Sequence, residues 1–242
     1  MISFDPMLGF ALGAVFVGGL FRGFAGIGAA LIIVPAPTLV YSPVTAVVLM
    51  SLIEIPGALQ LARTAVREAD WRGLAPLCIA AAVTIPLGAW MLAILDADIV
   101  RRSIAGMVVL FGAVIATGWR YKGEVTKALS AAIGTVGGFC SGIASLGGPP
   151  VVMFLIAKGS NAAQTRAGII TYFGLAMLLR LAAFGVYDLY SADAFWLSLI
   201  LGPVYMSGIW VGSRYFKGVS ETVFRRVVVA LVLIMGVFAL LK

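Results

Sequence analysis

Long apolar runs recur along the whole chain, and they restrict its fold more than any other feature of the sequence. Several reach about 18 residues or more, which is enough for a helix to cross the hydrocarbon core of a bilayer. Hydrophobic residues make up 62% of the chain and charged residues 11%, whereas soluble domains average about 45–50% apolar residues. The pattern predicts a polytopic helical membrane protein.

Two of the predicted segments are too short to cross a bilayer as regular helices. They cover 28–41 and 147–157, or about 21 Å and 17 Å at 1.5 Å per residue, against a core of about 30 Å. The other segments are long enough to span: 7–24, 44–62, 73–95, 100–119, 127–143, 166–186, 194–213 and 222–241.

Each short segment coincides with a stretch rich in glycine and proline, at 23–37 and 138–150. Breaks at corresponding positions of two halves are typical of transport sites, and the backbone N–H groups at a broken helix end attract anions. The alternative is that the glycines only allow tight helix packing. The candidate substrate-binding residues are Gly26, Gly28, Pro35, Pro37, Ser141, Ser145, Gly147, Gly148 and Pro149.

Basic residues and an internal repeat predict the topology. Loops 63–72, 120–127, 158–166 and 214–221 carry Lys or Arg and are expected in the cytoplasm, whereas 41–43, 96–99 and 187–193 carry none. Gly23-Phe24 recurs as Gly138-Phe139, and Gly88-Ala89-Trp90 resembles Gly208-Ile209-Trp210.

We therefore predict an all-α polytopic membrane protein with a single membrane domain over 1–242. It contains two inverted repeats, 1–120 and 121–242, each with four long transmembrane helices and one short broken or re-entrant segment. Counting only the long spans would give parallel halves instead.

Two ionisable residues lie inside predicted spans, where such residues mark functional sites by default. Glu54 precedes Pro56 and is the proton-coupling candidate, because burial favours an uncharged carboxyl group. It alternatively satisfies an arginine or the backbone groups at the proline. Arg180 is the anion-attracting candidate. It alternatively pairs with a carboxylate or snorkels to the outer face, and snorkelling is slightly favoured.

Other chemistry has little support in the sequence. The chain has no histidine, and we interpret Cys78 and Cys140, both in apolar runs, as buried small hydrophobes. We predict no catalytic residue, no metal site and no cofactor. The net charge of +7 is read as a topology signal, so no nucleic-acid partner is expected.

The sequence resembles the TauE/SafE-type sulfite exporter family, also described as the sulfonate uptake permease family. The resemblance rests on 23–28 with Pro35, on 138–142 running into 147–150, and on Gly88, Arg101 and Gly208. It implies a multi-pass transporter of the bacterial inner (plasma) membrane that moves sulfite, sulfoacetate or a related sulfonate. It also implies that the two Gly/Pro motifs form the permeation region.

The leading hypothesis is a secondary transporter of a small anion, acting as an exporter driven by the membrane potential or coupled to protons. An anion channel or passive facilitator would suit the same broken segments. An enzyme is disfavoured because histidine, a cysteine nucleophile with a base and an aqueous domain are all lacking. The predicted partners are a small anionic substrate and the lipid bilayer. Substrate, coupling and oligomeric state stay open, with a homodimer as one option.

Overall fold

The computed structural model describes residues 6–25, 29–38, 40–117, 121, 123, 125–158 and 161–215, and its regular elements are helices. Five described helices are long and apolar enough to cross a membrane: Trp71–Ile94, Ala97–Thr117, Lys127–Ala144, Gln164–Val186 and Ala192–Arg214. Shorter apolar helices accompany them. These findings confirm the all-helical class for the described residues and five of the predicted long segments.

Two predicted segments and one predicted loop need comment. The segment 44–62 is not one helix, because α4 (Pro43–Ile53) and α5 (Ile55–Glu68) meet at Glu54. Pro56 lies in the first turn of α5 and has no N–H to continue the hydrogen bonds of α4. The helix α5 also extends to Glu68, into the predicted loop 63–72. The segment 222–241 lies outside the described residues.

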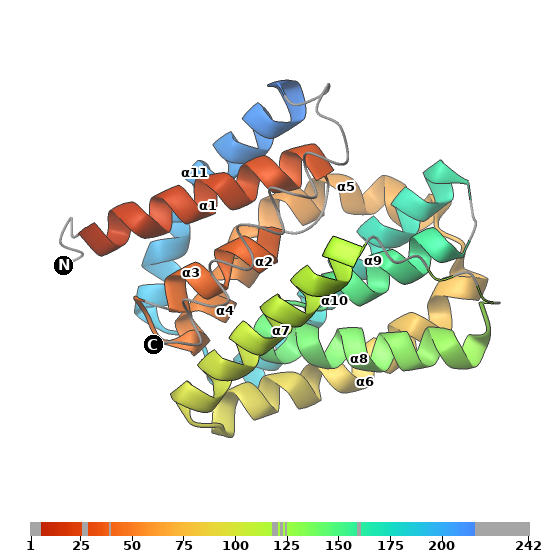
Figure 1. The fold of residues 1–242 in the computed structure, drawn as a ribbon, viewed down its shortest axis with the longest axis horizontal. Coiled ribbons are helices and arrows are strands. Elements are labelled where there is room, and N and C mark those ends of the chain that lie inside the picture. Colours follow the sequence, from red (N-terminus) through yellow and green to blue (C-terminus); the bar gives the residue numbers. More distant parts are fainter. Residues whose placement is uncertain are drawn as a thin grey trace. The chain divides into compact units, whose positions relative to one another are not determined.

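The chain divides into two compact units, each made of pieces from both predicted repeats (Figure 1). The first unit comprises Met1–Ile53, Asp96–Gly118 and Tyr190–Lys242, and the second comprises Glu54–Leu95 and Trp119–Leu189. The first holds α1 (Pro6–Ala25), α2 (Ala29–Ile33), α3 (Pro35–Thr38), α4, α7 (Ala97–Thr117) and α11 (Ala192–Tyr215). The second holds α5, α6 (Trp71–Ile94), α8 (Lys127–Ala144), α9 (Gly148–Ala157) and α10 (Ala162–Val186).

The helices α6 and α8 of the second unit pack closely against each other at glycine residues. The two helices run parallel, with contacts that advance from Leu77 beside Gly134 to Ile85 beside Gly142. A Cβ atom placed on Gly142 would lie 3.0 Å from Cα of Gly88, and one on Gly88 would lie 3.0 Å from Cα of Gly142. Small residues at this crossing therefore allow the two backbones to touch, as is common in membranes.

The helices α1 and α11 make a matching crossing in the first unit. They also run parallel, with Phe16 beside Gly208 and Leu20 beside Gly212. A Cβ atom on Gly19 would lie 2.5 Å from the carbonyl oxygen of Tyr205. Here too, no side chain larger than hydrogen fits at the contact.

The two crossings correspond residue by residue. Gly208 on α11 contacts α1 as Gly88 on α6 contacts α8, in agreement with the match between the two Gly-x-Trp motifs. Gly19 on α1 corresponds to Gly142 on α8, because Gly19 lies against Gly208 as Gly142 lies against Gly88. The register on this helix therefore differs from the one that the Gly-Phe dipeptides suggest.

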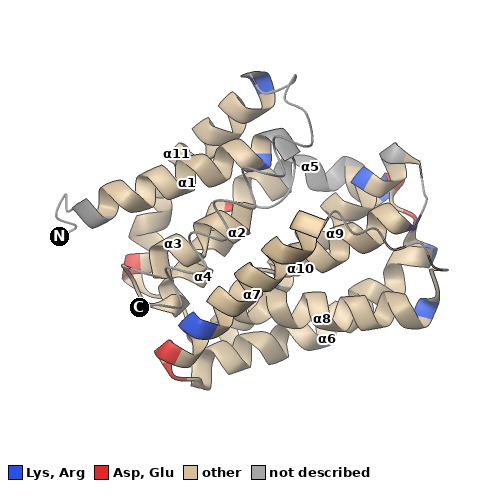
Figure 2. Cartoon of the chain, viewed as in Figure 1, with Lys and Arg blue, Asp and Glu red and all other residues tan. Residues whose placement is uncertain are grey.

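An ion pair lies at one end of the second unit. Lys158, which follows α9, places Nζ 2.6 Å from Oδ2 of Asp70, which precedes α6. The start of α6 and the end of α9 therefore lie at the same end of this unit, as is expected if the predicted loops 63–72 and 158–166 share one face. The helix α8 begins at this end with Lys127, and Lys and Arg gather here while most of each helix is uncharged (Figure 2).

This ion pair makes a pH-dependent contribution to stability. The hydrogen bond from Lys158 is the main cause that holds the pKa of Asp70 below its ordinary value of 3.8, with partial burial acting in the opposite direction. A lowered folded-state pKa stabilises the fold above the unfolded value, and this gain is lost as the pH falls through the folded pKa. The Asp70 side chain is 40% exposed, so solvent screening keeps the gain small.

We expect Asp70→Asn to lower the free energy of unfolding at neutral pH by a few tenths of a kcal/mol up to about 1 kcal/mol. The difference from wild type should shrink as the pH falls below about 4. Thermal unfolding in detergent at several pH values measures it. An equal difference at neutral and acid pH would contradict this assignment.

Candidate functional site

The second Gly/Pro stretch forms a turn between a long and a short helix. The helix α8 ends at Ala144, and Ser145 takes the left-handed conformation with φ 55°, which is uncommon for a residue other than glycine. The N–H of Ser145 donates to the carbonyl of Ser141 at 2.9 Å. The helix α9 starts at Gly148 with Pro149 in its first turn, where a missing N–H costs no hydrogen bond.

The turn folds back, so α9 begins inside the second unit. A Cβ atom on Gly147 would lie 2.9 Å from Cβ of Ser141 and would also meet the carbonyl of Gly137, one to two turns before α8 ends. From there α9 runs back to the basic end, where Lys158 pairs with Asp70. With 10 residues it is about 15 Å long. The N-terminus of this half-length helix therefore lies in the interior of the unit.

A buried cation lies beside this turn. The guanidinium of Arg180, on α10, donates from Nη1 to Oγ of Ser141 at 3.1 Å and from Nη2 to Oε2 of Glu54 at 2.9 Å. Arg180 is 2% exposed, and its Nε has no hydrogen-bond partner among the described residues. The arginine therefore does not snorkel, and the alternative in which it pairs with a carboxylate is the one found.

One hydroxyl group from α10 completes the polar cluster. The hydroxyl of Tyr172 is buried and has no hydrogen-bond partner in the described part of the chain. A Cβ atom on Gly137 would lie 3.3 Å from the Tyr172 hydroxyl and 3.3 Å from the carbonyl oxygen of Gly147. The Tyr172 hydroxyl thus reaches α8 at the level of the start of α9.

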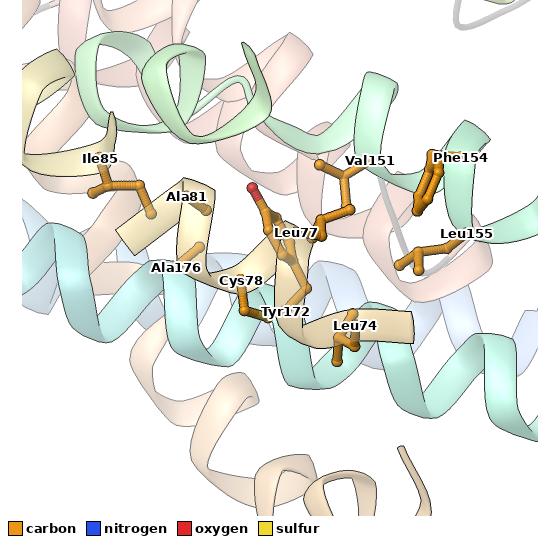
Figure 3. Close-up of a cluster of buried hydrophobic side chains, with 10 residues drawn as sticks. All are labelled: Leu74, Leu77, Cys78, Ala81, Ile85, Val151, Phe154, Leu155, Tyr172 and Ala176. Carbon is orange, nitrogen blue, oxygen red and sulfur yellow. The ribbon is translucent and has the colours of Figure 1, made fainter. Parts of the chain in front are cut away.

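An apolar cluster holds Tyr172 in this position. Its ring packs among Leu77 and Ala81 of α6 and Val151 of α9, and Figure 3 shows the hydroxyl at the end of the ring nearest α8. Cys78 belongs to the same cluster. Both Cys78 and Cys140 are free and buried, as predicted for small hydrophobes.

The site combines several donors with one carboxylate. The guanidinium, the buried hydroxyls and the positive end of α9 all favour a negatively charged partner. Glu54 supplies the negative charge in the structure, and its side chain is 12% exposed. Two opposite charges buried together are tolerated because each is paired and hydrogen-bonded. The cluster is suited to hold an oxyanion.

The structure brings together the predicted residues of the second half, and the described part of the first stretch belongs to the first unit. Ser141, Gly147, Glu54 and Arg180 form the cluster described above, and the sequential neighbours Ser145, Gly148 and Pro149 belong to the same turn. Pro35 and Pro37 are buried in α3 of the first unit. Gly26 and Gly28 lie outside the described residues.

The end of α3 has its own charged contact within the first unit. Nε of Arg101, on α7, donates to the carbonyl of Thr38 at 3.2 Å, and Nη1 pairs with Asp98 at 2.6 Å. A guanidinium that binds the last carbonyl of a helix stabilises the negative end of its dipole. The contact explains a structural role for Arg101.

Sequence reasoning missed the part that α10 plays apart from Arg180. Tyr172 precedes Arg180 by about two helical turns, so both project from one side of α10. This spacing of a hydroxyl and a cation in an apolar span is the signal that could have indicated Tyr172. No cluster of His, Cys, Asp and Glu able to hold a metal ion occurs among the residues that the structure describes.

The apolar helices and the ion pair buried among them define a multi-pass membrane protein with a polar site in its interior. The chain belongs to the TauE/SafE family, because the family model described as "Sulfite exporter TauE/SafE" matches residues 11–239. It is therefore a membrane transporter of a sulfur-anion family, and this is not a family of enzymes. No curated protein and no solved structure matches the chain.

Proposed function

We propose that this protein is a secondary transporter that exports sulfite, sulfoacetate or a related sulfonate across the bacterial inner membrane. The observation that carries the proposal is Arg180, a buried cation that faces the interior start of a half-length helix. A cation inside a membrane span is costly, and it marks a substrate or ion pathway by default. The membrane potential alone drives an anion outward with about 2.3 kcal/mol per charge per 100 mV.

The anion binds at the start of α9 in this proposal. The N–H groups of Gly147 and Gly148 and the hydroxyls of Ser141 and Ser145 supply hydrogen bonds, and Arg180 supplies the charge, whereas Pro149 and Pro150 have no N–H to donate. Gly148 leaves the backbone open to the ligand, whereas Gly147 packs against α8. A Cβ atom on Gly148 would approach Phe173 no closer than 3.4 Å, so packing alone does not require this glycine. The contribution of Pro35 and Pro37 to the same site stays a prediction.

We also propose that the two repeats are inverted. The matching crossings of α6 with α8 and of α1 with α11 support a duplication, since each joins one helix from either repeat. The short helices α2, α3 and α9 occupy corresponding places in the two sequences. An odd number of segments in each repeat would then reverse its orientation.

Purified protein in proteoliposomes should exchange internal and external sulfoacetate or sulfite by saturable counterflow. Labelled anion taken up against a concentration gradient of unlabelled anion measures this exchange, and liposomes without protein are the control. An unsaturable ohmic anion current without counterflow would favour the channel instead. The absence of any flux of sulfite, sulfoacetate or thiosulfate would contradict the proposed function.

A further inference from the structure

The ion pair between Glu54 and Arg180 occupies the place where the proposed function requires an anion. Oε2 of Glu54 lies 2.9 Å from Nη2 of Arg180, and the two side chains are 12% and 3% exposed. A carboxylate and a sulfonate or sulfite present similar acceptor oxygens to a guanidinium. Glu54 therefore imitates the ligand when no ligand is bound.

Charge balance makes the two anions compete. The pair of Glu54 and Arg180 carries no net charge, so a second anion at this buried position would leave an uncompensated negative charge. Such a charge costs several kcal/mol away from water. If Glu54 takes up one proton as a sulfonate or sulfite group arrives, Arg180 again faces one anionic group, and the neutral carboxyl group is released from the guanidinium.

The other ionisable groups that the structure describes beside Tyr172 do not provide this exchange. Besides Tyr172 itself, on α10, they are Cys140 on α8 and Cys78 on α6. Phenol and thiol groups are ordinarily protonated and neutral near pH 7, so they have no negative charge to give up. Glu54 is the carboxylate in contact with Arg180, and it lies at the start of α5 rather than within a helix.

We propose that Glu54 and the transported anion alternate on Arg180, so that each anion binds together with one proton taken up by Glu54. This inference rests on the proposed function and adds its coupling. A transporter of this kind moves the anion and the proton in the same direction. The proton then cancels the charge that a monovalent anion carries, so the concentration gradient of the anion, and no longer the membrane potential, must drive its export.

The test uses sulfoacetate, whose charge is constant between about pH 6 and pH 8 because both of its acid groups stay ionised. The affinity of the wild-type protein should rise as the pH falls, by up to about tenfold per pH unit for one linked proton. In weakly buffered detergent solution, addition of sulfoacetate should remove protons from the medium. Calorimetry measures the affinity and a pH indicator measures the uptake.

The variant Glu54→Gln imitates the protonated side chain. It should bind sulfoacetate at least as tightly as the wild type does at low pH, without dependence on pH and without proton uptake. The matched control Asp98→Asn removes the carboxylate of the exposed pair with Arg101 and should behave as the wild type does. If Glu54→Gln does not fold, proton uptake by the wild type decides the question.

The outcomes separate the two proposals. Binding by the wild type without proton uptake, or unchanged pH dependence in Glu54→Gln, would overturn the exchange and leave the proposed function intact. No binding of sulfoacetate, together with no flux in proteoliposomes, would overturn the proposed function itself.

Discussion

Replacing Arg180 by methionine should abolish anion binding and destabilise the protein, and adding Glu54→Gln should restore the stability but not the binding. The single change leaves Glu54 without its cation in a position where its side chain is 12% exposed. Breaking one side of a buried ion pair typically costs about 3–5 kcal/mol. The double variant has no buried charge left at the pair, so most of this loss should be recovered.

The two readouts distinguish a binding role from a structural one. Thermal unfolding in detergent measures the stability, and calorimetry with sulfoacetate and sulfite measures the binding. Arg102→Gln is the control, because this neighbouring arginine of α7 is exposed and lies in the first unit. A double variant that is stable and still binds either anion with wild-type affinity would show that Arg180 only neutralises Glu54.

The sequence was sufficient to predict most of the long helices, because the hydrocarbon core demands long apolar runs. It was misleading where one continuous apolar run contained the ends of two helices. The run 44–62 is mostly apolar, yet it contains the boundary between the two units at Glu54. The Ile55-Pro56 dipeptide was the available sign of that boundary, since proline removes a helical hydrogen bond.

The candidate site was predictable in its parts and not in its assembly. Glu54 and Arg180 were recognisable one at a time because ionisable residues are rare in membrane spans. Their contact joins residues 126 positions apart, and no periodicity within either helix encodes it. Tyr172 was missed because an aromatic residue in an apolar run looks like any other core residue until its hydroxyl is found without a partner.

The glycines at the helix crossings were harder to interpret from the sequence than those in the Gly/Pro stretches. Both Gly/Pro stretches drew attention because they break helices. Yet Gly88, Gly142, Gly19 and Gly208 lie inside regular helices, where glycine is unfavourable by about 1 kcal/mol relative to alanine. This cost is offset by packing, because the absence of a side chain allows the backbones of the two helices to touch.

Replacing Gly142 or Gly88 by alanine should therefore destabilise the protein although alanine is the better helix former. The new methyl group would press on the backbone of the facing helix, which cannot turn away as a side chain can. Overpacking of this kind typically costs about 1–3 kcal/mol, and sometimes more. Gly174→Ala on α10 is the matched control, because nothing lies within 4 Å of the added carbon. It should stabilise the protein slightly.

The same experiment on the first unit tests the correspondence between the crossings. Gly19→Ala and Gly208→Ala should lower the unfolding temperature about as much as Gly142→Ala and Gly88→Ala do, since the contacts are alike. Gly106→Ala on α7 is the control for this unit, with open space around the new carbon. Loss at one crossing and tolerance at the other would mean that only one pair of helices depends on backbone contact. The duplication would then be a likeness of sequence without a shared packing requirement.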